Sequence, residues 1–214
     1  MGRLLDMSAY PRREHFEYFC SLPYPYVGVT VETDVSGLVN HCKETGRSFY
    51  LMFMHAAALA ADSIPAFRQR VHGGGIMEYD QCPTSHTEMK PDGTYCYCTL
   101  HHHMPLQEYL IQAQAAREKC QADGGIQEEE DVESMYFIST LPWLHYSSLI
   151  QPVAGGEESN PRITWGRYIQ NEQGLYTLPV TVLAHHALVD GSHLGLFFER
   201  LKIQLGVRSE ELGV

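Results

Sequence analysis

The chain has 214 residues, and 26 acidic against 15 basic residues give it a formal charge of −11 at pH 7. This length suits a single domain, 1–214, which can bury about 70% of the surface of the unfolded chain without help from disulfides or metals. The negative charge argues against nucleic acid as a partner, because such binding depends on clustered Lys and Arg side chains.

Targeting signals and cross-links are not indicated. Residues 1–8 lack a basic start followed by a long apolar run, and no stretch of about 18 apolar residues could span a membrane. We therefore expect a cytoplasmic protein with no membrane partner. The cysteines are scattered in a chain that needs no cross-links, so we expect all six to be reduced thiols. They are Cys20, Cys42, Cys82, Cys96, Cys98 and Cys120.

The first half of the chain predicts two helices. Asp34 or Ser36 can cap a helix that runs toward Gly46. Ser48 can cap a longer and more apolar helix, which must end before Pro65 because proline cannot continue it. Both helices should face the core.

Residues 67–100 contain three β-like runs separated by glycine- and proline-rich turns, which predicts a meander. In the last run the residue types alternate. Cys96 and Cys98 should share one face of the strand, and Tyr95 and Tyr97 the other.

The segment from Cys96 to His103, C-x-C-x-x-H-H-H, carries residue types that bind zinc. No second C-x-x-C or H-x-x-x-H pair completes a tetrahedral set, and the strand alternation explains the two cysteines. We therefore expect no metal.

The second half of the chain again mixes helix and strand. Pro105 begins a helix with one apolar stripe that ends at Gly124, and the charged run 128–131 is typical of a solvated loop. Residues 162–169 and 175–184 form a predicted hairpin. Helices and strands in this order predict an α+β fold, a sheet with helices packed mainly on one face.

The most specific feature is the pattern H-H-x-x-x-D-G, which begins at His185 and ends at Gly191. A β-rich run precedes it and an apolar-periodic run follows, so it lies where a strand leads into a helix. By itself the pattern is also compatible with two strand histidines and a helix-capping Asp190. A rigidly held imidazole, with an unperturbed pKa of about 6.5, is well suited to accept a proton at pH 7.

Three motifs together resemble the chloramphenicol acetyltransferases over nearly the whole chain. Residues 10–16 (Y-P-R-R-E-H-F) are similar to the N-terminal aromatic-x-R-x-E-H-F segment of that family, and residues 138–143 (I-S-T-L-P-W) to its central S-x-L-P-W segment. The third is H-H-x-x-x-D-G, which lipoyl acyltransferase cores and peptide-synthetase condensation domains share. The resemblance implies the coenzyme-A-dependent acyltransferase fold, a two-layer sandwich of a mixed β-sheet with helices on one face, in a homotrimer with active sites between subunits.

The resemblance also implies catalytic roles. His186 would be the general base, its tautomer fixed by a main-chain carbonyl, and Ser139 would donate a hydrogen bond to the oxyanion. Thr164 would support the intermediate through water. Asp190 would form a largely buried pair with Arg12 and so tie the first strand to the catalytic loop. An ordinary core serine and strand threonine are the alternatives for Ser139 and Thr164.

Acetyl-CoA would be the cosubstrate. The resemblance places its contacts at Trp143, Arg167 and Tyr168. The hydroxyl acceptor, with chloramphenicol the first candidate, would contact aromatic residues of 19–26 and of the strand before residue 100: Phe19, Tyr26, Tyr95 and Tyr97. Because Tyr97 falls where the family tends to carry a small residue, we expect inefficient acetylation of chloramphenicol.

The sequence therefore predicts an acyltransferase acting on a small hydroxyl compound, with antibiotic resistance as the implied role. Two alternatives stay open. One is an enzyme of the same fold with another acceptor, such as lipoamide or an unknown small alcohol or thiol. The other is a catalytically retired scaffold, against which the simultaneous presence of His186, Ser139, Asp190 and Arg12 argues.

Overall fold

The computed structural model describes residues 2–127 and 131–211, with side chains to residue 206, and is built around one mixed β-sheet. The strand order is β2-β10-β8-β7-β5-β6, and β9 pairs with β10. Strands β5, β7 and β8 are mutually parallel, while the other pairings are antiparallel. The strands are β2 (Tyr26–Asp34), β5 (Thr84–Met89), β6 (Tyr95–Leu100), β7 (Tyr136–Thr140), β8 (Arg162–Trp165), β9 (Ile169–Gln170) and β10 (Tyr176–His185).

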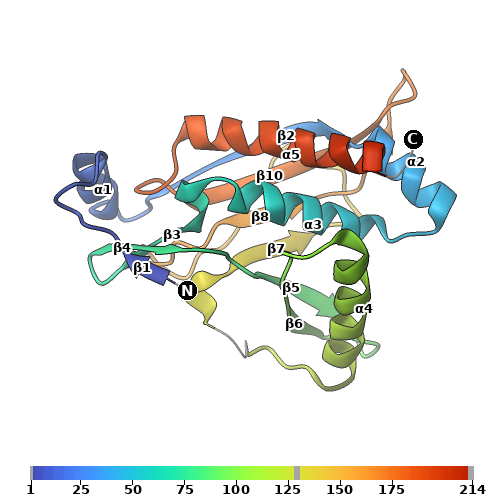
Figure 1. Cartoon of the computed structure of the whole chain (residues 1–214), viewed down its shortest axis with the longest axis horizontal. Coiled ribbons are helices and arrows are strands. Elements are labelled where there is room, and N and C mark those ends of the chain that lie inside the picture. Colours follow the sequence, from blue (N-terminus) through green and yellow to red (C-terminus); the bar gives the residue numbers. More distant parts are fainter. Residues whose placement is uncertain (1, 128–130, 212–214) are drawn as a thin grey trace.

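Helices cover one face of this sheet, as predicted. In Figure 1, α3 and α5 lie side by side across the sheet, and α4 packs beside β5 and β6. The helix α3 is apolar around most of its circumference and is almost entirely buried, as expected for the centre of the core. Within the described ranges, no helix is long and apolar enough to cross a membrane. The helices are α1 (Arg13–Cys20), α2 (Ser36–Thr45), α3 (Phe49–Asp62), α4 (Leu106–Asp123) and α5 (Gly191–Glu211), with short 3-10 turns η1 (Pro65–Arg68) and η2 (Val132–Ser134).

Most of the predicted boundaries are confirmed. Gly46, with a φ of 68°, ends α2, and the Ser48 hydroxyl accepts a hydrogen bond from the amide of Leu51 at the start of α3. The helix α4 ends before Gly124, as expected. Of the charged run 128–131, only its last residue lies within the described residues.

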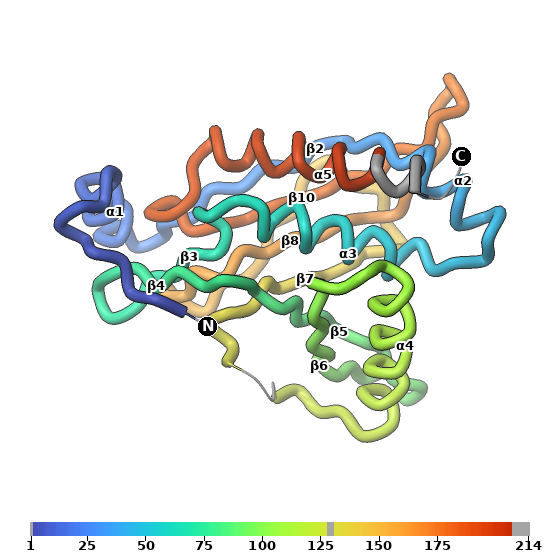
Figure 2. The backbone as a smooth tube through the Cα atoms, viewed as in Figure 1, coloured from blue at the N-terminus to red at the C-terminus, as the bar shows by residue number. Residues whose placement is uncertain are grey.

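The predicted meander is wrong. The first strands of that region, β3 (Gln69–His72) and β4 (Gly75–Tyr79), form a hairpin that pairs with β1 (Gly2–Leu4) in a separate three-stranded sheet. Only the β5–β6 hairpin belongs to the main sheet. The backbone tube in Figure 2 shows the small sheet at the same end of the molecule as α1. The strand pattern predicts that strands exist, but it does not say which neighbours they choose.

The fully buried guanidinium of Arg70 explains part of this arrangement. It donates hydrogen bonds to the carbonyl oxygens of Glu133 and Met135, at 2.7 and 2.9 Å, and so ties β3 to the segment that enters β7. A buried cation must satisfy its donors, and here main-chain oxygens provide the partners. The small sheet is thereby anchored to the main one.

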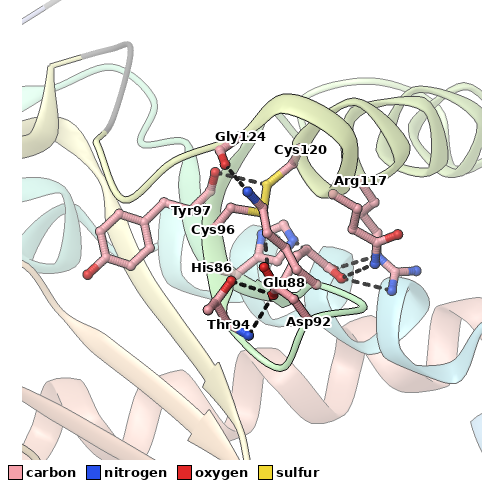
Figure 3. Close-up of a disulfide and its surroundings, with 11 residues drawn as sticks. His86, Glu88, Asp92, Thr94, Cys96, Tyr97, Arg117, Cys120 and Gly124 are labelled. Atoms are coloured by element: carbon pink, nitrogen blue, oxygen red, sulfur yellow. Dashed lines mark hydrogen bonds and ion pairs between the residues drawn. A yellow bond between two sulfur atoms is a disulfide. The ribbon is translucent and has the colours of Figure 1, made fainter.

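The expectation of six reduced cysteines is also wrong, because Cys96 and Cys120 form a disulfide that joins β6 to α4 (Figure 3). The other four cysteines are not in a disulfide. The alternation predicted for β6 is confirmed, since Cys96 is buried while Tyr95 and Tyr97 are exposed. The same alternation turns Cys96 toward α4, a proximity that a separation of 24 residues does not reveal.

Candidate active site

His186 lies directly after the last residue of β10 and is held on three sides. Its main-chain amide donates to the carbonyl of Pro25 at 2.7 Å, and the ring of Phe19 stacks on its imidazole with centroids 3.9 Å apart. Its Nδ1 lies 3.0 Å from the carbonyl oxygen of Val189. Because a carbonyl can only accept, this contact places the proton on Nδ1 and leaves Nε2 with a free lone pair. The ring is therefore arranged to act as a base.

The neighbouring His185 has the opposite tautomer. Its Nε2 donates to the carbonyl of Gly156 at 2.9 Å, and its Nδ1 accepts from the amide of Ala187 at 3.3 Å. Burial lowers the pKa of His185 below its usual value, so the ring is neutral at pH 7. His185 is thus a structural residue, because both of its ring nitrogens are bound to the main chain.

Arg12 and Asp190 form an ion pair, with Nη2 and Oδ2 3.2 Å apart. Two details of the expectation are wrong. Their side chains are 24% and 34% exposed, so the pair is half-buried rather than largely buried. Arg12 also lies directly before α1, not on a strand. Its Nη1 donates to the carbonyl of Leu188 at 2.6 Å, which ties α1 to the loop that holds His186.

Asp190 also caps α5. Its Oδ1 accepts hydrogen bonds from the amide and the hydroxyl of Ser192, at 3.0 and 2.6 Å. Partial burial raises the pKa of this carboxyl, but the hydrogen bonds from Ser192 and His193 and the charges of His193 and Arg12 outweigh it and lower the pKa to about 2. Helix cap and ion pair are therefore two functions of one carboxylate.

Ser139 belongs to a row of hydroxyls that crosses the face of the sheet opposite the helices. It is in register with Thr164 on β8, which is in register with Thr181 on β10. The hydroxyl of Thr181 shares a hydrogen bond of 2.7 Å with that of Thr30 on β2. The hydroxyl of Thr164 accepts a hydrogen bond of 2.5 Å from the side-chain amide of Gln151. Gln151 belongs to no motif, and no sequence signal would have identified it.

A cavity of about 480 Å³ opens on the same face. Ser139, Tyr97, Phe137 and Arg162 are among the residues that line it. Tyr95 lies beside Tyr97, with ring centroids 6.0 Å apart. The cavity therefore combines a polar hydroxyl with aromatic walls, as a site for a small organic molecule requires.

The position of Tyr97 depends on the end of α4. The strand β6 is the last strand of the sheet, and the amide of Tyr97 donates to the carbonyl of Gly125 at 2.9 Å. Cys120 Sγ lies 3.2 Å from the Tyr97 carbonyl oxygen, and its disulfide with Cys96 fixes the two elements together. Figure 3 shows the Tyr97 ring pointing away from the disulfide. The disulfide thus holds the strand that carries a wall of the cavity.

Within one chain, His186 and Ser139 do not meet. Ser139 is two strands away from Thr181, which corresponds to about 10 Å, and His186 is five residues beyond Thr181, which adds about 16 Å along the strand. One acyl group could not contact both side chains. The structure instead gathers His186, Asp190 and Arg12 at one place, and Ser139 with Thr164 at another.

The remaining candidate residues are placed as follows. Trp143 is 68% exposed in the turn after β7, and Arg167 is exposed nearby, its amide donating to the carbonyl of Leu144 at 2.6 Å. The ring of Tyr168 packs against Phe49, 5.0 Å between centroids, in contact with the core. The Tyr26 hydroxyl donates to carbonyls at Gly155 and Glu158, so it holds the loop after β7.

Comparisons with known proteins show the family of this chain. The model of the family described as "Chloramphenicol acetyltransferase" matches residues 2–202. The chain is 25% identical over 202 residues to a chloramphenicol acetyltransferase from Proteus mirabilis, covering 93% of this chain and 92% of the relative. It is 27% identical over 203 residues to one from Klebsiella sp, covering 92% and 91%.

Solved structures show the same fold. A chloramphenicol acetyltransferase with 24% identity superposes with a TM-score of 0.82, covering 96% of this chain and 100% of the other. A probable dihydrolipoamide acetyltransferase from Listeria monocytogenes, 14% identical, gives a TM-score of 0.66 with 92% of each chain covered. The two-layer fold is thus that of the coenzyme-A-dependent acyltransferases. The family match over residues 2–202 and the curated relatives show that the protein is an acyltransferase. More particularly, the chain belongs to the chloramphenicol acetyltransferase family, whose model matches nearly its whole length.

Proposed function

We propose that the protein is an acetyl-CoA-dependent O-acetyltransferase, with His186 as the general base and chloramphenicol as its acceptor. The observation that carries this proposal is the hydrogen bond from His186 Nδ1 to the Val189 carbonyl, which leaves Nε2 free to take a proton. The stacked ring of Phe19 limits rotation of the imidazole. A base that is oriented in advance loses little entropy when the substrate binds.

The reaction uses few groups. His186 Nε2 takes the proton of the acceptor hydroxyl while the oxygen of that hydroxyl attacks the thioester carbonyl of acetyl-CoA. The hydroxyl of Ser139 donates a hydrogen bond to the resulting oxyanion, and Thr164 supports the intermediate through water. When the intermediate collapses, the C–S bond breaks and the coenzyme A thiolate takes the proton from the imidazolium. Asp190 and Arg12 hold the base in place without touching the substrate.

The site requires more than one subunit. His186 and Ser139 lie too far apart in one chain, and the cavity with Ser139 opens outward on the helix-free face. We therefore propose a homotrimer in which each cavity is completed by His186 of the partner subunit. Light scattering should give the mass of three chains at micromolar concentration, whereas the mass of one chain would contradict an interface site.

The substrate contacts follow from the same arrangement. Trp143 and Arg167 are exposed and available for acetyl-CoA, the indole for an apolar arm and the guanidinium for a phosphate. Tyr168 would contact acetyl-CoA only through the part of its ring that does not pack against Phe49. Phe19, Tyr26 and the Tyr95–Tyr97 pair would surround the acceptor. A cytoplasmic location and a role in antibiotic resistance complete the proposal.

The decisive experiment measures thiol release from acetyl-CoA with chloramphenicol, other small alcohols and lipoamide as acceptors. Wild type should release thiol with chloramphenicol, and His186→Ala should lower kcat by roughly 10² to 10⁴-fold with a melting temperature close to that of wild type. The matched control is His72→Ala, which removes an exposed histidine on β3. Activity of His186→Ala within tenfold of wild type would reject His186 as the base, and activity with lipoamide alone would change the acceptor.

A further inference from the structure

Three potential metal ligands meet at the end of α3, and none of them is among the residues that line the cavity with Ser139. Asp62 is the last residue of α3, and His102 and His103 follow β6. His102 Nε2 lies 3.0 Å from Asp62 Oδ2, and His103 Nε2 contacts the same oxygen. The side chains of Asp62 and His102 are 3% and 1% exposed, whereas that of His103 is 36% exposed.

The two imidazoles direct the same nitrogen at one point. The three ligand atoms all lie within 4.8 Å of one another. Zinc held at about 2.0 Å by each ligand needs tetrahedral neighbours about 3.3 Å apart, so small rotations would admit the ion. His103 is the most exposed of the three and is the side chain that can rotate outward. Two histidines with one carboxylate are a common zinc ligand set.

The surroundings orient these ligands. The Tyr136 hydroxyl donates to Asp62 Oδ1 at 2.7 Å, and the amide of Cys82 approaches the same oxygen at 3.3 Å. Both histidines contact Oδ2, and the Cys82 amide is also 3.5 Å from it. His55 Nε2 donates to the carbonyl of His102 at 2.9 Å and so fixes the main chain there. Such support around the ligands is a regular feature of metal sites in proteins.

Charge and ring contacts favour a cation at this point. Asp62 is buried, and both of its ionic contacts are with imidazoles, which carry no charge unless protonated. A divalent ion would neutralise the carboxylate without protonating a buried ring. Nδ1 of His102 is buried and has no hydrogen-bond partner among the described side chains and backbone. The polar contact of this ring is therefore made by Nε2, to Asp62 Oδ2.

From this cluster we infer that Asp62, His102 and His103 bind one Zn²⁺, with the fourth position open to water beside His103. The C-x-C-x-x-H-H-H segment thus supplies His102 and His103 but not its cysteine pair, because Cys96 is in a disulfide. The third ligand comes from a helix forty residues earlier. The ion would join the end of α3 to the segment after β6 and, through Tyr136, to the start of β7.

Zinc binding by the full chain, freed of any histidine tag and treated with a chelator, tests the proposal. Equilibrium dialysis against ZnCl₂ should give one ion per chain, and zinc should raise the melting temperature. His103→Ala, at a partly exposed position, should weaken binding at least about 100-fold and abolish the thermal shift. The matched control, His72→Ala, removes an imidazole that pairs with Glu133 at 2.9 Å and should bind zinc as wild type does.

Cobalt(II) substitution supplies a second readout that does not depend on stability. The proposed ligands predict visible bands of a tetrahedral ion without a thiolate-to-cobalt charge-transfer band, and His103→Ala should abolish these bands. A thiolate-to-cobalt band would show that a cysteine such as Cys82 is a ligand, and this result would overturn the assignment. Less than stoichiometric binding by wild type, or undiminished binding by His103→Ala, would show that the three side chains form a hydrogen-bonded network instead.

Discussion

Asp190→Asn and Asp190→Ala separate the two functions of one carboxylate. Asparagine keeps an oxygen that can cap α5 but removes the charge that meets Arg12, whereas alanine removes both. Folding lowers the pKa of Asp190 from 3.8 to about 2, which corresponds to at most about 2 kcal/mol of stability at neutral pH. Since the side chain is 34% exposed, solvent screening reduces this to about 1 kcal/mol.

The expected losses follow from these terms. Asp190→Asn should lower the free energy of unfolding by about 1 kcal/mol, and Asp190→Ala by about 2 kcal/mol, because the cap contributes about 1 kcal/mol more. Arg12→Ala should also cost about 1 kcal/mol. The double variant Arg12→Ala with Asp190→Asn should lose less than the sum of the two single variants, as a shared ion pair requires.

Urea denaturation at fixed protein concentration and pH 7 measures these losses in the free energy of unfolding. The same measurement at a series of pH values tests the direction in which the stability changes with pH. Because folding lowers this pKa, its stabilisation is complete above about pH 4 and is lost as the pH falls toward 2. The stability of Asp190→Asn should lack this pH-dependent contribution. Additive losses would refute the ion pair, equal losses for asparagine and alanine would refute the cap, and losses of about 3 to 5 kcal/mol would indicate a fully buried pair.

Three other substitutions test the cavity. Ser139→Ala should lower kcat by roughly 10²-fold with little change in either KM, because its hydroxyl acts on the transition state, and an effect on KM alone would make it a binding residue. Cys120→Ser should lower the free energy of unfolding by about 3 kcal/mol, since the disulfide spans 24 residues, and should raise KM for the acceptor only. Dithiothreitol, which reduces the disulfide, should raise KM for the acceptor in wild type as well. An unchanged KM would refute the role of the disulfide in holding the cavity wall. Tyr97→Ala should lower KM for chloramphenicol, and a micromolar wild-type KM that this change worsens would refute the steric argument.

Local chemistry explains why much of this molecule could be predicted from its sequence. The end of α2 follows from Gly46 and the limits of α3 from Ser48 and Pro65, each of which acts on the backbone within a few residues. The start of α2 does not follow the prediction, because its N-cap is Val35 and not Asp34 or Ser36. The position of His186 at the end of a strand follows from the β-rich run before it and the helical run after it. The Arg12–Asp190 contact came from resemblance to a family, not from any local rule.

The errors concern contacts between distant segments. The strand pattern predicted β3 and β4 but not their pairing with β1, because register and partner depend on tertiary packing. The cysteine count could not reveal that Cys96 and Cys120 face each other. The sequence could not predict that Asp62 meets His102 and His103, because no spacing rule links the end of one helix to histidines forty residues later.

The loop between His185 and Gly191 shows why its residues act as one unit. Its carbonyl oxygens at Leu188 and Val189 are bound by Arg12 and by His186 itself, at 2.6 and 3.0 Å. A tight loop exposes such oxygens, and here their satisfaction fixes both the loop and the imidazole. Loss of Arg12 frees one of these oxygens and the capping carboxylate at once. Arg12 therefore helps to fix the loop that orients the His186 ring, although it lies outside the motif that contains His186.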